Sequence, residues 1–214
     1  MTHPYPRSYG WLASAVLAAG LLCACAPLLL GGAMVGGSLV LTDRRTSGAQ
    51  VEDQTIELKS ISRINELLGN RAHVNTTSYN RMVLITGEVP TQADKETVER
   101  AVSRIQNVRA IVNELRVAGN SSVTSRSSDS IITGKVKAQF VDARDLFANT
   151  IKVVTERGVV YLMGRVTERE ASRASGLART VSGVHKVVQV FEILTEAELT
   201  AIQKKTAGGA GTKR

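Results

Sequence analysis

The chain has 214 residues, a formal net charge of +8, and 43% hydrophobic, 21% charged and only 4% aromatic residues. The hydrophobic and charged proportions are those of globular proteins and exclude bulk disorder, while so few aromatic side chains argue against a base-stacking surface or an aromatic-lined ligand pocket. The only two cysteines, Cys23 and Cys25, lie near the N-terminus, which excludes a disulfide-stapled fold or a cysteine-based zinc site in the rest of the chain.

The first 24 residues have the layout of a secretion signal. Residues 11–22 (WLASAVLAAGLL) form an apolar stretch of small side chains, with the length of a signal-peptide hydrophobic region. Leu22 lies three positions before Cys25 and Ala24 directly before it, an arrangement that resembles the lipobox of bacterial lipoproteins. We therefore expect residues 1–24 to be a lipoprotein signal peptide and Cys25 to be the lipid-attachment site.

Two alternatives remain open for this leader: an uncleaved membrane helix over residues 11–30, about the 20 residues needed to span a bilayer, and ordinary secretion. Pro27 is unfavourable in a spanning helix, and the small residues before Cys25 suit a signal peptidase. In lipoproteins of this kind an Asp after the cysteine favours retention in the inner membrane, so Ala26 indicates the outer membrane. Residues 26–41 are apolar and glycine-rich, either a linker against the bilayer or a second short hydrophobic segment.

The remaining chain contains one pattern twice. Residues 73–94 (HVNTTSYNRMVLITGEVPTQAD) are similar in chemistry, position by position, to residues 151–170 (IKVVTERGVVYLMGRVTERE). Gly87 aligns with Gly164, and Pro90 is an extra residue in the first copy. Self-similarity of this kind indicates two copies of one structural unit.

Periodicity and turn residues predict the order α-β-β-α-β in each copy. Residues 55–68 place Ile61, Ile64, Leu67 and Leu68 three or four positions apart, which is the spacing of an amphipathic helix. Two β-rich segments follow on either side of a hairpin turn. In the first copy these are residues 73–78 and 82–88 around the turn at 79–81, and the turn of the second copy is at 156–158.

The rest of each copy is a helix and a last strand. Gly87 and Gly164 are expected to end the second strand. The next helix opens with a capping-box pattern, Thr91 with Asp94 in the first copy and Thr167 with Glu170 in the second. A last strand is expected at residues 109–117 and 186–194.

Two antiparallel strands plus a third, with helices on one face, predict an α+β fold in which the helices pack on a small three-stranded sheet. Units of about 70 residues bury a modest core, so we expect the two to pack against each other. The expected organisation places a lipidated N-terminus and apolar linker before the first domain and a polar linker between the domains. The N-terminal segment spans residues 25–49, the first domain 50–118, the polar linker 119–128 and the second domain 129–195. Residues 196–214 are expected to be a C-terminal tail, of which residues 207–214 are expected to be unfolded.

Two such units, each with a strand ending in hydrophobic-Gly-x-Val and a following helix, resemble BON domains. Residues 42–54, which include GAQVED, and residues 161–171 (YLMGRVTEREA) are similar to the dual-BON outer-membrane lipoproteins in particular. The resemblance covers roughly residues 21–195. It implies a non-enzymatic protein on the periplasmic face of the outer membrane of a Gram-negative bacterium, which supports envelope integrity and binds anionic phospholipid through its second BON domain.

The charge distribution agrees with that implication. Residues 50–118 hold nine basic and nine acidic side chains, whereas residues 126–195 hold eleven basic and seven acidic ones, a net charge of +4. Each Lys or Arg near an anionic membrane surface contributes about 1 kcal/mol, so an excess of this size is enough to matter.

The contact is expected on the first helix of the second unit, residues 129–147. The stripe expected to face the sheet is Ile132, Val136 and Phe140. Ile131 and Lys135 then share an adjoining face, with Lys137 further round, and an apolar residue beside lysines suits an interfacial contact. We therefore name Ile131, Lys135 and Lys137 as candidate phospholipid-binding residues. The alternative is that Ile131 covers the core and both lysines are ordinary solvated charge. The resemblance implies a large aromatic at the position of Ile131, and hence weaker binding here.

No catalytic residue, metal site or cofactor is expected. The three histidines, His3, His73 and His185, are scattered, and no histidine is expected near a strand-end acid. The sequence contains no Gly-x-Ser-x-Gly elbow and no P-loop lysine. A pI near 9.8 can indicate nucleic acid, but a lipoprotein leader places the chain outside the cytoplasm.

The expected partners are therefore anionic phospholipids and the membrane that holds acylated Cys25. The rival hypothesis is a lipid-anchored scaffold that docks envelope proteins for outer-membrane assembly or cell-wall hydrolase regulation. In a scaffold the lipid contact would be incidental, so the two hypotheses differ in their dependence on salt and on lipid headgroups. A periplasmic osmotic-stress protein is a third possibility, which the lipobox disfavours.

Overall fold

A computed structural model describes residues 43–210, with side chains to residue 204. The expected signal peptide and Cys25 lie outside this range. The first domain consists of α3 (Ser47–Leu68), η2 (Gly69–Arg71), β1 (His73–Tyr79), β2 (Met82–Val89), α4 (Gln92–Ser103), β3 (Ala110–Asn113) and β4 (Arg116–Val117). The second consists of α5 (Val123–Asp142), η3 (Ala148–Thr150), β5 (Ile151–Glu156), β6 (Val159–Thr167), α6 (Glu168–Arg179) and β7 (Lys186–Leu194), and α7 (Glu196–Ala210) follows it. None of the helices in the described range is long and apolar enough to cross a membrane.

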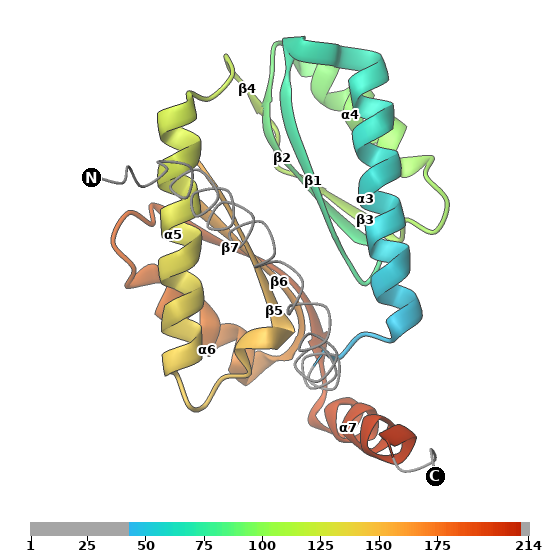
Figure 1. The fold of residues 1–214 in the computed structure, drawn as a ribbon, viewed down its shortest axis with the longest axis vertical. Helices are drawn as coiled ribbons and strands as arrows, with labels where there is room; N and C mark the ends of the chain where they lie inside the picture. Colours follow the sequence, from blue (N-terminus) through green and yellow to red (C-terminus); the bar gives the residue numbers. More distant parts are fainter. Residues whose placement is uncertain (1–42, 211–214) are drawn as a thin grey trace, which may run out of the picture. The chain divides into compact units, whose positions relative to one another are not determined.

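The predicted order α-β-β-α-β is confirmed in both domains (Figure 1). In each sheet a hairpin pairs two antiparallel strands, β1 with β2 and β5 with β6, and the last strand then pairs in parallel with the second. A parallel partner requires a crossover connection, and α4 and α6 provide it. The last strand of the second domain is continuous as predicted, but residues 109–117 form two short strands, because Glu114 and Leu115 interrupt the ladder between β3 and β4.

Each domain has its own core on the face of the sheet that its helices cover. In the second domain Ile132, Val136 and Phe140 of α5 are 6%, 0% and 1% exposed and pack against β5, β6 and α6, as predicted. In the first domain Ile64 and Leu68 of α3 are buried as predicted, but the other two predicted residues are not. Ile61 and Leu67 are exposed, because the face is set by residues four apart. These are Ile56, Ser60, Ile64 and Leu68.

A third apolar cluster joins the two domains. Tyr79 and Leu84 of the first sheet and Tyr161, Met163 and Val190 of the second are all at most 5% exposed and form one cluster. The faces of the two sheets opposite their helices therefore pack on each other, which explains why nearly every residue of β2 and β6 is buried. The expectation that the two small units support each other by packing is confirmed.

Gly87 and Gly164 lie inside their strands and do not end them, because β2 continues to Val89 and β6 to Thr167. A Cβ on Gly87 would lie 2.0 Å from the carbonyl oxygen of His73, and the residue has φ of +112°. Glycine is therefore required at this position by the close approach of β1 and by its backbone conformation.

Two other expectations fail at the helix termini. Residues 119–128 were expected to be linker, but α5 begins at Val123 because the side chain of Ser122 accepts a hydrogen bond from the amide of Ser125. Residues 196–214 were expected to be a tail, unfolded over residues 207–214, yet α7 runs from Glu196 to Ala210. Its start is a reciprocal pair of hydrogen bonds between Thr195 and Glu198, which is a capping box.

The capping boxes predicted for the crossover helices are present in one domain. Thr167 and Glu170 form both reciprocal bonds at the start of α6. Thr91 accepts from the amide of Asp94, but the carboxylate of Asp94 accepts a hydrogen bond of 2.6 Å from the Thr91 hydroxyl in place of the backbone amide. Aspartate is one methylene shorter than glutamate, which accounts for the difference.

Candidate functional site

The two hairpin turns are each held by a buried aspartate from the first helix of the same domain. Asp53 of α3, 2% exposed, accepts hydrogen bonds of 2.8 and 2.7 Å from the backbone amides of Asn80 and Arg81. Asp129 of α5, 6% exposed, accepts bonds of 2.8 Å from the amides of Arg157 and Gly158. Asp53 and Asp129 therefore have the same role, and the two domains share these hydrogen bonds as well as the order of their helices and strands. Neither aspartate was singled out from the sequence: Asp53 and Asp129 are 76 positions apart, whereas the aligned glycines Gly87 and Gly164 are 77 apart.

The segment before α3 is anchored on the second domain. Arg44 is 7% exposed and donates two hydrogen bonds of 2.7 Å to the carboxylate of Glu170, which is 1% exposed, and one of 2.8 Å to the carbonyl of Arg165. Burial alone raises the pKa of Glu170, but the hydrogen bonds from Arg44 and from the Thr167 amide outweigh it and hold the pKa below its usual value. The point at which the chain leaves toward Cys25 is therefore attached to the second domain.

A second buried carboxylate, Glu88 of β2, lies between the domains. Its oxygens accept hydrogen bonds from the guanidinium of Arg157 and, at 3.0 Å, from the amide of Ser121, and His73 Nδ1 lies 3.2 Å away. Burial raises the pKa of Glu88, but Arg157 and Ser121 reverse the effect and lower it. The expectation that no histidine lies near a strand acid is wrong here, because antiparallel pairing places His73 opposite Glu88.

His73, Glu88 and Glu156 have ligand atoms within 4.8 Å of one another, a grouping that sequence spacing did not reveal. The carboxylate of Glu88 is already paired with the guanidinium of Arg157, so a cation among these groups would have to share that carboxylate with Arg157. We interpret the cluster as an ion-pair network that joins the domains.

The candidate phospholipid-binding residues lie on exposed parts of α5. Ile131 is 60% exposed, and Lys135 and Lys137 are also exposed. Neither lysine forms an ion pair with an acid among residues 43–204. Ile131 and Lys135 are one helical turn apart and share a face, while Lys137 lies about 120° around the helix from Ile131.

The structure thus brings Ile131 and Lys135 together and places Lys137 on another side of α5. Lys137 lines a cavity of about 340 Å³, and the other basic side chains of this cavity are Arg45 and Lys152. Its apolar wall includes Ile151 and Val141, which is 71% exposed. Arg45 and Lys152 are both paired, with Asp53 and Glu57 at 2.8 Å, so Lys137 is the cation of this cavity with no carboxylate partner among the described side chains. Arg45 and Lys152 were not singled out from the sequence, because they come from other elements.

Comparisons with known proteins agree with the repeated fold. Residues 52–119 and 128–195 each match the BON domain. Over 173 residues the chain is 38% identical to the outer membrane lipoprotein DolP of Haemophilus influenzae, and the match covers 79% of this chain and 89% of that protein. It is 33% identical to the 21 kDa hemolysin of Actinobacillus pleuropneumoniae, covering 70% and 78%, and 27% identical to osmotically-inducible protein Y of Escherichia coli, covering 53% and 58%.

Proposed function

Because this chain belongs to the BON-domain family and carries two copies of the domain, we propose that it is a non-enzymatic outer-membrane lipoprotein whose second BON domain binds anionic phospholipid. Acylated Cys25 anchors the chain on the periplasmic face, and the lipid contact is made by Ile131, Lys135 and Lys137 of α5. The relationship to DolP, named an outer membrane lipoprotein, supports the location. The protein then supports the integrity of the outer membrane.

The observation that carries the lipid-binding proposal is the exposure of Ile131 next to an unpaired lysine. An isoleucine that moves from water into an apolar environment gains about 1.5–3 kcal/mol, and each lysine near an anionic surface adds about 1 kcal/mol. Lys135 lies one turn from Ile131 with no carboxylate partner in the described range. The two effects together are enough for weak, salt-dependent binding to an anionic surface.

A weak contact is sufficient because the anchor supplies the affinity. A single acyl chain gives only marginal membrane binding, whereas several chains hold a protein firmly. The α5 contact then has a different consequence, which is to concentrate the protein laterally where anionic lipid is abundant. If charge reversal of Lys135 and Lys137 leaves the distribution of the protein in the membrane unchanged, this sorting role is wrong.

Ile131→Glu tests the lipid contact against a matched control. Leu58 on α3 is 69% exposed, so Leu58→Glu makes the same kind of change on the first domain. In co-sedimentation with anionic vesicles, Ile131→Glu should abolish binding of an unacylated 43–214 fragment and Leu58→Glu should leave it unchanged, with thermal unfolding confirming that both fragments are folded. Equal binding by the two variants would show that Ile131 does not make the lipid contact.

A further inference from the structure

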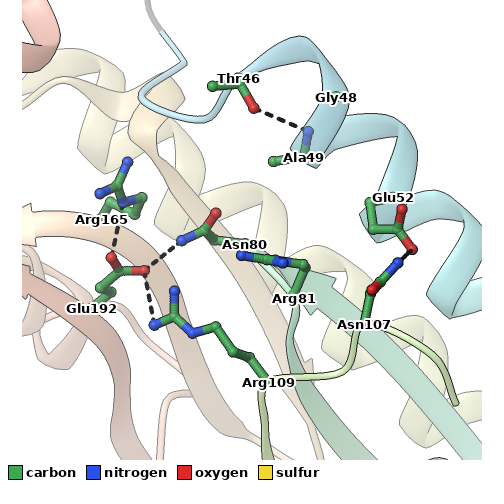
Figure 2. A pocket seen from close by; sticks show the side chains of 10 residues that line it. All are labelled: Thr46, Gly48, Ala49, Glu52, Asn80, Arg81, Asn107, Arg109, Arg165 and Glu192. Atoms are coloured by element: carbon green, nitrogen blue, oxygen red, sulfur yellow. Dashed lines mark hydrogen bonds and ion pairs between the residues drawn. The ribbon is translucent and has the colours of Figure 1, made fainter.

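A polar cleft of about 470 Å³ lies away from the proposed lipid-binding residues, between the two BON domains (Figure 2). Its walls are the first turn of α3, the β1–β2 turn, the residues that lead into β3, and strands β6 and β7. Three arginines line it: Arg81 and Arg109 from the first domain and Arg165 from the second. None of these arginines is needed by the lipid contact on α5.

The carboxylates of the cleft neutralise these cations only in part. Glu192 accepts a bond of 3.1 Å from Arg165 Nε and one of 2.6 Å from Asn80 Nδ2, and it lies 3.7 Å from Arg109 Nη2. The other acid that lines the cleft, Glu52, accepts a hydrogen bond of 3.0 Å from the side-chain Nδ2 of Asn107. Within residues 43–210 the guanidinium of Arg81 makes no hydrogen bond or ion pair, so the cleft retains an uncompensated positive charge.

The backbone of Arg81 has a conformation that is unfavourable for residues with a side chain. It has φ of +66°, in the left-handed region that glycine adopts without strain. The equivalent residue in the β5–β6 turn is Gly158, with φ of +72°. Both turns place their central residues in the left-handed region, with φ of +50° at Asn80 and +49° at Arg157, so Arg81 is a side chain at a turn position that favours glycine.

The residue that donates a backbone hydrogen bond to this turn also differs between the domains, and again the first domain has an arginine. The amide of Arg109 donates to the carbonyl of Arg81 at 2.8 Å, as the amide of His185 donates to the carbonyl of Gly158 at 2.8 Å. One backbone arrangement therefore presents two adjacent arginines in the first domain and a glycine with a histidine in the second. Both arginines line the same cleft, so an anion bound there would be attracted by both charges.

One strand position, compared between the two sheets, carries opposite charges at the two ends of the domain interface. The aligned strand positions are Glu88 in β2 and Arg165 in β6, one residue after Gly87 and Gly164. At the first position a carboxylate lies among Arg157, the Ser121 amide and His73. At the second position β6 carries Arg165. The same strand position therefore holds a carboxylate at one end of the domain interface and a guanidinium at the other end.

We propose that this cleft binds a phosphate group, with Arg81 and Arg109 donating to its oxygens and with Arg165 held in place by Glu192. Guanidinium groups match phosphate oxygens in geometry and in charge. The polar walls, which include Thr46, Asn80 and Asn107, suit a headgroup or a free phosphate and are unsuited to an acyl chain. The positive end of the α3 dipole adds to the attraction.

Isothermal titration of the full chain in dodecyl maltoside, with inorganic phosphate as the first probe, tests the proposal. Arg81→Gly installs the residue of the second domain, so it should relieve strain and raise the melting temperature while it weakens phosphate binding about tenfold. Arg109→Gln should weaken binding in the same direction. Arg63→Gln, which changes an exposed arginine of α3 paired only with Glu66, should bind phosphate as the unchanged chain does.

A second probe, sn-glycero-3-phosphoglycerol, distinguishes the two sources of phosphate. Tighter binding than inorganic phosphate identifies a phospholipid headgroup, and equal or weaker binding identifies a free phosphate group. The proposal is overturned if the unchanged chain shows no binding of either probe at about 10 mM, or if Arg81→Gly and Arg109→Gln bind both probes as the unchanged chain does. Ile131→Glu should leave this titration unchanged, so the result is independent of the lipid contact on α5.

Discussion

Arg44 and Glu170, 126 positions apart in the sequence, meet through two hydrogen bonds of 2.7 Å with both side chains buried. The contact ties the segment that precedes the first BON domain to the first turn of the crossover helix in the second. The same carboxylate completes the capping box with Thr167. One residue pair therefore couples the attachment of the N-terminal segment to the local folding of α6.

Removal of one partner of this pair is expected to be costly. Arg44→Met leaves the Glu170 carboxylate buried without its cation, and breaking a buried pair in this way costs about 3–5 kcal/mol. Denaturant unfolding should show a loss of that order. Arg63→Met, which breaks the exposed pair with Glu66, should change the free energy of unfolding by less than about 1 kcal/mol. Equal losses in the two variants would contradict the role given to Arg44.

Stability should fall in acid because the pKa values of Glu88 and Glu170 are lowered in the folded state. A carboxyl group with a depressed pKa stabilises the fold above its unfolded pKa, about 4.3, and this contribution is lost as the pH falls through the folded value. The free energy of unfolding should therefore decrease below about pH 4. Glu88→Gln should reduce stability at pH 7 and weaken the acid dependence, and an unchanged profile in that variant would be evidence against the Glu88–Arg157 network.

Glu156 is expected to act in the opposite direction. It is 7% exposed, and burial raises the pKa of its carboxyl group despite a hydrogen bond of 3.1 Å from Asn75. Its charged form is thus disfavoured in the folded state at neutral pH, and this penalty is absent below the unfolded pKa of about 4.3. Glu156→Gln should be more stable than the unchanged chain at pH 7 and equally stable at pH 3.5. A loss of stability at pH 7 would contradict this assignment.

Two glycines should respond to alanine with opposite signs. Gly87→Ala places a methyl group against the His73 carbonyl in a backbone conformation unsuited to alanine, and should cost more than about 1 kcal/mol. Gly134, in the middle of α5, has nothing within 4 Å of the position of a Cβ. Gly134→Ala should therefore raise the free energy of unfolding by about 0.5–1 kcal/mol, because alanine favours the helix. Thermal unfolding of both variants provides the comparison.

Local pattern was sufficient to predict the element order and the faces of several elements. Ile132, Val136 and Phe140 lie four apart, so the buried face of α5 follows from periodicity alone. The same reasoning failed for Ile61 and Leu67 of α3, because the helix extends to Ser47 and its full length selects a different stripe. The capping box of α7 was present in the sequence as a Thr-x-x-Glu pattern, but the glycine-rich residues that follow suggested a tail.

The polar contacts between the domains could not be predicted from the sequence. Arg44 with Glu170 and Arg157 with Glu88 join residues far apart in the chain, and no periodicity indicates which charges will meet when two sheets pack. The repeat did contain one unused signal. Asp53 and Asp129 are each the second residue of a BON-domain match, and a shared acid in two otherwise divergent helices points to a shared structural role.

Vesicle co-sedimentation of the unacylated fragment 43–214 tests the central claim most directly. The fragment should bind vesicles rich in phosphatidylglycerol, bind zwitterionic phosphatidylcholine vesicles poorly, and lose binding as the salt concentration rises from about 50 to 500 mM, because the lysine contribution is screened. Binding that is absent under all of these conditions, or equal on both lipids and insensitive to salt, would contradict the account and leave acylated Cys25 as the membrane contact of a protein-binding scaffold.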